Sequence, residues 1–241
     1  MDFDVLPGPS LPERARTALA QAATATVSDP RLARAPAATS QVPVRAARDG
    51  SPLLLPRTGS LVAAWLAGGQ ESVRVSLPAG PPFSALRITG PARLVAAAGG
   101  SGITACTVRV DSVEFTGASP ARVAAGEYRA AAPDPLWRVA PGVLHHLEHG
   151  HLGDLVRCVR AHGMGAAEWV VPRGLDRYGL ELLVFTADGI AAVRLSFPDG
   201  PVASLNDVPV SLRAALTCHC RAEPGHGHGT APGPGSCGGR R

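Results

Sequence analysis

The chain has 241 residues, of which 45% are hydrophobic and 17% are charged. Its apolar runs fall well short of the roughly 18 residues that a membrane-spanning helix needs, so we expect no membrane partner. The N-terminus has acidic residues and no basic segment followed by an apolar core, which predicts a cytoplasmic protein without a secretion signal. The length suits two modest domains of roughly 100 to 150 residues each.

The net charge of +4 does not by itself indicate nucleic-acid binding. All 23 basic residues are arginine, and they are scattered along the chain rather than clustered. Aromatic residues, on which bases stack, make up only 4% of the chain. We therefore expect no nucleic-acid partner. The five cysteines are an odd number in a chain without a secretion signal, so we expect reduced thiols.

Two helices are predicted in the first 70 residues. After a disordered lead over residues 1–10, the segment from Leu11, "LPERARTALAQAATATV", has proline in its first turn and small apolar residues at helical spacing. The proline-rich stretch that follows, "SDPRLARAPAATSQVP", is expected to be irregular. The segment "SLVAAWLAGG" predicts a short helix that ends at Gly68 and Gly69.

The middle of the chain changes to the period of β-strands. The segments "ESVRVSLP", "FSALRITGPARLVAA" and "ITACTVRVDSVEF" alternate apolar and polar side chains, which predicts three long antiparallel strands. Gly90 and Pro91 interrupt the second segment and predict a bulge or a bend there. The turn-like "PDP" at residues 133–135 marks the expected domain boundary.

The second half predicts one helix, three strands and a final helix. The first helix is expected to run from Pro141 to about Ala161, with His151 on a stripe of leucines, where its side chain points toward the core or a pocket. The strands "AAEWVV", "YGLELLVFT" and "IAAVRLSF" follow, and "ADG" joins the last two in a hairpin that ends at Gly189. The last helix covers "SLNDVPVSLRAALTC", and residues 219–241 are expected to form a disordered tail.

Residues 133–218 resemble the C-terminal α/β domain of unknown function that accompanies flavin-type split β-barrels in haem-utilisation proteins. The helix signature of that family is similar to His-Leu-Asn-any-Asp-His. Here His146, Leu147 and His151 match it, whereas Glu148 and Gly150 depart from it. Two later motifs of the family correspond to residues 174–176 and to the Arg-any-any-Phe-Pro pattern, which begins at Arg194.

The resemblance implies an α+β fold with an N-terminal antiparallel split β-barrel over residues 11–132. A small α-β-β-β-α domain over residues 133–218 would follow it. The barrel resembles the pyridoxamine-phosphate-oxidase-like, FMN-binding class by its pattern alone, because the loop between Val27 and Val42 has no cluster of residues suited to clamp a flavin phosphate. Split barrels of this class close their cofactor site between two subunits, so a homodimer is implied.

The function implied by the resemblance is binding of haem or a related tetrapyrrole, with oxidative haem degradation as its enzymatic version. Two alternatives stay open. The protein is a flavin-dependent oxidoreductase if the barrel keeps a flavin site, or a cofactor-free scaffold or regulator if both sites have decayed.

The candidate cofactor-binding residues are histidines and one arginine. His146 and His151 are five residues apart, which places them about 140° apart around a continuous helix, so we do not expect both to face one small ligand. Arg194 is a candidate partner for a propionate, with a solvated strand face as the alternative. In the haem-utilisation proteins an iron-ligating histidine comes from a C-terminal loop. The corresponding candidates here are His219, His226 and His228.

No dedicated metal site is expected. The spacing of His145, Glu148 and His149 is similar to a zinc-protease pattern, but no second helix supplies the further ligand that such enzymes need. Cys218 at the end of the predicted last helix and two cysteines of the tail, Cys220 and Cys237, also lie near histidines, but a glycine- and proline-rich segment does not hold them in a fixed geometry. Metal binding by the tail is therefore expected to be adventitious.

Overall fold

The computed structural model describes residues 8–32, 39–80, 83–97, 102–197, 199–204, 206–208 and 210. The predicted disordered tail and most of the predicted last helix and disordered lead lie outside the described residues. Within the described part, the protein has an α+β fold with a nine-stranded antiparallel sheet and a separate three-stranded one. No described helix is long and apolar enough to cross a membrane.

The larger sheet has the strand order β6-β7-β3-β2-β1-β4-β5-β8-β9. Its strands, in chain order, are β1 (Thr24–Ser28), β2 (Thr39–Ala46), β3 (Pro52–Leu54), β4 (Val73–Pro78), β5 (Phe83–Gly90), β6 (Ala92–Ala97), β7 (Thr104–Val108), β8 (Ser112–Gly117) and β9 (Ala121–Val123). Among the described residues the edge strands β6 and β9 each pair with one neighbour and not with each other. The sheet is therefore not closed between β6 and β9, and the predicted split barrel stays a prediction.

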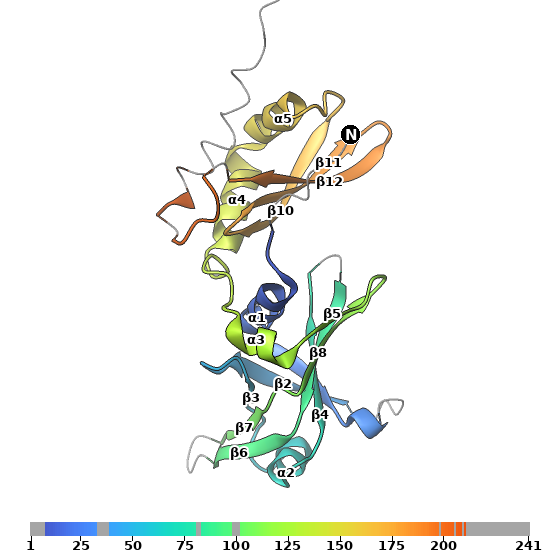
Figure 1. The fold of residues 1–241 in the computed structure, drawn as a ribbon, viewed down its shortest axis with the longest axis vertical. Helices are drawn as coiled ribbons and strands as arrows, with labels where there is room; N and C mark the ends of the chain where they lie inside the picture. Colours follow the sequence, from blue (N-terminus) through green and yellow to red (C-terminus); the bar gives the residue numbers. More distant parts are fainter. Residues whose placement is uncertain are drawn as a thin grey trace, which may run out of the picture.

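Three helices accompany the larger sheet: α1 (Leu11–Gln21), α2 (Leu61–Ala67) and α3 (Ala125–Ala130). Helix α2 lies at the end of the molecule beside β6 and β7, whereas α1 and α3 contact each other between the two sheets (Figure 1). Alternating valines and leucines of β4 and β5 form one hydrophobic core with Leu19 of α1 and Tyr128 of α3. The alternation that predicted strands thus marks the buried face of the sheet.

The interruption at Gly90 and Pro91 is confirmed as the point where the chain leaves one strand and begins the next. Strand β5 pairs with β4 and β8, while β6 pairs with β7. A Cβ atom at Gly90 would lie 1.7 Å from the carbonyl oxygen of Arg109, so only glycine allows the backbone to approach this closely.

Three long strands were predicted in the middle of the chain, but the structure has five shorter ones. Residues 104–117 turn between Val108 and Ser112 and form β7 and β8, so the region contains five strands, β4 to β8. The segment before residue 46 was also assigned wrongly. Helix α1 ends at Gln21, and β1 and β2 occupy residues predicted to be helical or irregular. The two strands pair with each other, β1 also pairs with β4, and β2 also pairs with β3. This tertiary pairing outweighs the local alanine and proline content.

The smaller sheet consists of β10 (Trp169–Asp176), β11 (Gly179–Thr186) and β12 (Gly189–Ser196), which pair in chain order. The hairpin at Gly189 is confirmed, and this glycine has a φ of 142°. Helices α4 (Ala140–Gly150) and α5 (Leu152–Ala161) cover one face of the sheet (Figure 1). Leu147 of α4, Leu155 of α5 and Leu182 of β11 belong to this second core.

The predicted single helix from Pro141 to Ala161 was wrong in one respect, because it is broken at His151. The backbone of His151 has φ −133° and ψ 17°, outside the helical region. Glycines stand at 150 and 153, on either side of the break, and each lowers the helical propensity of this stretch by about 1 kcal/mol relative to alanine. The two shorter helices that result are the frame on which the candidate histidines lie.

Polar contacts join the two cores around α1. The buried carboxylate of Asp134 accepts hydrogen bonds from the main-chain N–H groups of Leu136 at 2.7 Å and Arg177 at 2.8 Å. The main-chain N–H of Asp134 in turn donates to the hydroxyl of Thr17 in α1 at 2.8 Å. Tyr178, in the turn between β10 and β11, donates its hydroxyl proton to the carboxylate of Glu13 in α1 at 3.0 Å.

We expect the Tyr178→Phe variant to lose about 1 kcal/mol of the free energy of unfolding at neutral pH, because it removes a hydrogen bond to a charged group that is partly exposed. Burial raises the pKa of Glu13. Hydrogen bonds from Ser10 and Tyr178 lower this pKa by more than burial raises it, so the pKa of Glu13 lies below its ordinary value. The ionised carboxylate of Glu13 therefore makes its full contribution to the free energy of unfolding at pH values above its unfolded-state pKa. This contribution is lost as the pH falls through its folded-state pKa.

The measurement is urea unfolding of both proteins across the acid range, and the difference between them should shrink as the pH falls. Tyr128→Phe is the matched control, since the hydroxyl of Tyr128 donates to the uncharged carbonyl of Gly50 at 2.8 Å. The cost of this control substitution should not change over the same pH range. A cost of Tyr178→Phe that stays constant into acid would contradict the assigned role of Glu13.

Candidate functional site

The break at His151 brings the two signature histidines together. The Nε2 atoms of His146 and His151 are 3.2 Å apart, and the two rings meet edge to face with their centroids 5.0 Å apart. The expectation that they cannot face one small ligand was wrong, because it assumed a continuous helix. With α4 ending at Gly150 and α5 beginning at Leu152, the 140° separation no longer applies.

His151 does not point into the core, which excludes one of the two positions expected for its side chain. Its side chain is 41% exposed, and its Nδ1 atom lies 3.0 Å from the carboxylate of Asp154. Asp154 also pairs with Arg157. The hydrogen bond from His151 holds the pKa of the Asp154 carboxyl below its ordinary value, and the positive charge of Arg157 acts in the same direction. The core beneath is formed instead by leucines 147 and 155 on the two sides of the break.

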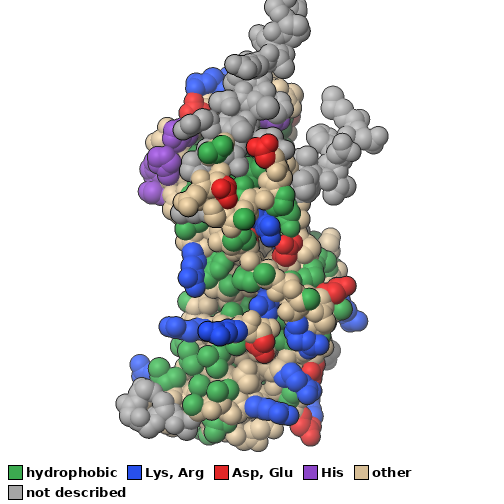
Figure 2. All heavy atoms as spheres, turned by 60° about the vertical axis from the view of Figure 1, so that its left-hand side comes forward, with side chains coloured by type: hydrophobic (Ala, Val, Ile, Leu, Met, Phe, Trp, Pro, Cys, Tyr) green, Lys and Arg blue, Asp and Glu red, His purple; other side chains and the backbone are tan. Residues whose placement is uncertain are grey.

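His145 and His149 form a second pair on the exposed side of α4. Their ring centroids are 4.0 Å apart, and the Nδ1 atom of His149 lies 2.8 Å from the carbonyl oxygen of His145. Figure 2 shows the histidines gathered at one edge of the molecular surface. In the part of the chain that the structure describes, no group of three or more histidine, cysteine, aspartate or glutamate residues is arranged to hold a metal ion.

Arg194 lies between two carboxylates. It pairs with Asp176 of β10, and its Nη1 atom is 3.0 Å from Glu181 of β11. Its side chain is only 13% exposed, so Arg194 itself is not solvated, although Ile190 and Ala192 on the same face of β12 are exposed. These contacts give Arg194 a structural role that joins two of the family-like motifs. Its contact with an anionic ligand stays a prediction. The strand alternation would have placed Glu181 opposite Arg194, and this pairing is the signal that the sequence analysis missed.

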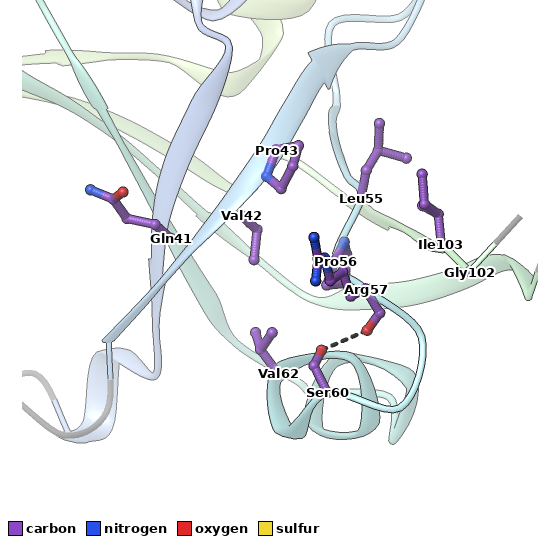
Figure 3. Close-up of a pocket in the computed structure, with 10 residues that line it drawn as sticks. All are labelled: Gln41, Val42, Pro43, Leu55, Pro56, Arg57, Ser60, Val62, Gly102 and Ile103. Carbon is purple, nitrogen blue, oxygen red and sulfur yellow. Dashed lines mark hydrogen bonds between the residues drawn. The ribbon is translucent and has the colours of Figure 1, made fainter.

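A groove of about 690 Å³ opens at the α2 end of the larger sheet (Figure 3). It is lined by residues 41–43 of β2, 55–57 after β3, 60 and 62 at the start of α2, and 102–103 before β7. Main-chain hydrogen bonds from Thr58 to Gly102 and from Thr104 to Pro56 hold two of these segments together. Ser60 caps α2, accepting from the N–H of Ala63 and donating to the carbonyl of Arg57 at 2.6 Å.

The groove is mainly apolar, with one cation at its edge. Apolar side chains of valine, leucine, isoleucine and proline form its walls. The side chain of Arg57 is exposed, and no carboxylate of a described residue forms a salt bridge with it. Sequence analysis did not find this site, because its residues come from four separated segments and carry no motif.

The uncovered face of the small sheet is a second apolar surface. Trp169, Phe185 and Ile190 lie side by side across its three strands, and the two outer residues are 52% and 64% exposed. A neighbouring hollow of about 370 Å³ is lined by Arg14, Arg173, Glu181 and Arg194 together with apolar residues. The remaining candidates from the sequence, His219, His226 and His228, lie outside the described residues.

The sequence matches no protein-family model, and no curated protein is similar to it. The structure is similar to that of a haem-binding protein from Mycobacterium smegmatis, with a TM-score of 0.63 and 21% sequence identity. The likeness covers 90% of this chain and 100% of that one. A protein of unknown function from Agrobacterium tumefaciens has 18% identity over 87% of this chain and 97% of its own, but its TM-score is 0.38. The first likeness shows that the two proteins share a fold along nearly their whole length.

Proposed function

We propose that the protein binds haem or a related tetrapyrrole. The observation that carries the proposal is the fold shared with the haem-binding protein of Mycobacterium smegmatis, which extends over 90% of this chain. A likeness that covers both parts of the chain supports a common ligand better than a likeness of one sheet alone. The sequence resemblance of residues 133–218 to haem-utilisation proteins points to the same class of ligand.

The groove beside α2 suits the porphyrin. Its volume of about 690 Å³ is larger than that of the hollow on the small sheet, and it lies in the range of roughly 300 to 1,000 Å³ typical of cofactor sites. Its apolar walls fit the faces of a macrocycle, and the guanidinium of Arg57 suits a propionate. The hollow on the small sheet also contains arginines, but its smaller volume of about 370 Å³ suits a macrocycle less well than the groove does. The described residues of the groove therefore fit the porphyrin and one propionate, but they supply no ligand for the iron.

The iron ligand has to come from outside the groove. The groove is lined by no histidine, cysteine, methionine or tyrosine among the described residues. The predicted ligands in the tail, His219, His226 and His228, are our candidates. His146 and His151 were predicted as well, but α4 and α2 lie at opposite ends of the molecule (Figure 1). A haem in the groove would therefore be out of reach of this pair in the same chain.

Bound haem would supply iron-centred oxygen chemistry, and the protein would contribute position and polarity. Storage or delivery needs only the binding step, and degradation needs a reductant and O2 in addition. A flavin-dependent oxidoreductase is the alternative, and it would carry a yellow chromophore when purified. Exposed apolar side chains at Leu61, at the start of α2, and at Leu94 and Val95 of the edge strand β6 support the proposed homodimer because a second copy would cover them.

We expect the unsubstituted protein to bind one haemin per chain, with a saturable shift of the Soret band. Ile103→Asp should weaken this binding at least tenfold, about 1.4 kcal/mol, because it places a charge against an apolar macrocycle. Ile190→Asp is the matched control, because Ile190 is also an exposed isoleucine but lies on the small sheet. A spectrum that follows free haemin would end the haem proposal, and a loss in Ile190→Asp alone would move the site to the small sheet.

The iron ligand is tested by a second pair of variants. Replacing His219, His226 and His228 together with alanine should weaken haemin binding at least tenfold, about 1.4 kcal/mol. The His146→Ala, His151→Ala double variant should keep the affinity of the unsubstituted protein. Unchanged affinity in the triple variant would show that the tail histidines do not bind the iron. A loss of affinity in the double variant would assign the iron to His146 and His151.

A further inference from the structure

We propose that His146 and His151 bind one divalent transition-metal ion through their Nε2 atoms. This site goes beyond the proposed haem function and does not depend on it, because the pair lies on the α4–α5 unit at the far end of the molecule from the groove (Figure 1). The ion would be exposed, so water molecules complete its coordination. Imidazole ligands without thiolates suit Zn²⁺, Cu²⁺ or Ni²⁺.

The distance between the two nitrogen atoms matches a shared ion. Zinc bonds to histidine nitrogen are roughly 2.0 to 2.1 Å long, and tetrahedral angles between them place two such nitrogens about 3.3 Å apart. The Nε2 atoms of His146 and His151 are 3.2 Å apart. Little movement of either ring is therefore needed for both to face one ion.

Asp154 sets the tautomer of His151 that a metal requires. Its Oδ2 atom lies 3.0 Å from Nδ1 of His151, and a carboxylate only accepts, so the neutral ring carries its proton on Nδ1 and leaves Nε2 to bind the ion. A carboxylate bonded to the far side of a ligating imidazole is the usual second contact of metal sites, and it fixes the orientation of the ring. The other oxygen of Asp154 accepts from Arg157, which holds the carboxylate in place. Asp154 is thus a positioning residue rather than a ligand.

The helix break itself is held firmly. The main-chain N–H of His151 donates to the carbonyl of Leu147 at 3.0 Å, and its own carbonyl accepts from the N–H of Leu155 at 3.0 Å. Leu147 and Leu155 are both buried in the second core. The backbone between the two helices is therefore bonded on both sides and anchored from below, which preorganises the two rings.

The alternative position for a metal ion on this helix is the pair His145 and His149. They are four residues apart, and their ring centroids are 4.0 Å apart. The Nδ1 atom of His149 lies within hydrogen-bond distance of a main-chain carbonyl, and no carboxylate of a described residue hydrogen-bonds to either ring. This pair provides a control of the same residue type on α4, close to the proposed site.

The test titrates Zn²⁺ into the full-length protein in competition with a chromophoric chelator. Because histidine and cysteine are zinc ligands and several lie between residue 218 and the C-terminus, all variants share one background in which residues 219, 226 and 228 become alanine and residues 218, 220 and 237 become serine. We expect the background protein to bind one Zn²⁺ per chain. His146→Gln with His151→Gln should weaken binding at least tenfold, and Asp154→Asn should weaken it about tenfold.

The control variant His145→Gln with His149→Gln should bind as the background does. Zinc bound by the His146/His151 variant but lost from the control would overturn the proposal, as would a background protein without saturable binding. In the latter case the two rings are only a hydrogen-bonded pair. Nitrogen-15 spectra of the histidine rings provide a readout that does not depend on substitution, and zinc should shift the Nε2 signals of two histidines in the background protein. Shifts in neither ring of the pair would contradict the site.

Discussion

The buried carboxylate of Asp134 constrains how the two halves of this protein meet. It accepts two main-chain hydrogen bonds, one from Leu136, two residues further along the chain, and one from Arg177 in the turn between β10 and β11. Burial raises the pKa of Asp134, and the two N–H donors counteract that rise. Because the main-chain N–H of Asp134 also binds Thr17, the carboxylate and its backbone connect α1 to the small sheet. Tyr178 reinforces the same connection by its contact with Glu13.

This connection separates two chemically different regions. The apolar groove lies beside α2 at one end of the molecule, and the histidines of α4 lie at the other (Figures 1 and 2). A macrocycle needs apolar walls and a cation, which the groove supplies through its lining and Arg57. An ion needs two nitrogens at a fixed distance, which the break at His151 supplies. The two proposals therefore rest on different residues and are tested independently.

The parts of the fold that depend on local pattern were predictable from the sequence. The alternation in β4, the bend at Gly90 and the hairpin at Gly189 follow from side-chain period and from the conformational freedom of glycine. The strands β1 and β2 were missed because alanine, threonine and proline do not form a marked pattern. Only pairing with β4 and β3 makes them strands. Long-range pairing of this kind cannot be read from neighbouring residues.

The candidate site was predictable in its residue types but not in its geometry. The signature pointed to His146 and His151, yet the angle between them depended on whether the helix continues through Gly150. Glycine at 150 and 153 indicated a stretch of low helical propensity, and in the structure the helix is broken there, at His151. The environment of Arg194 was missed for a related reason, since its partners come from two other strands. The groove was not predictable because it forms only when four distant segments fold together.

The most direct test of the central claim is a crystal structure of the full-length protein grown with haemin. The account predicts a porphyrin in the groove, its faces against Val62 and Ile103 and a propionate at Arg57. Haemin bound on the face of the small sheet, or at His146 and His151 in place of the groove, would contradict it. A structure that holds no haemin, obtained at saturating concentration, would contradict the haem function itself.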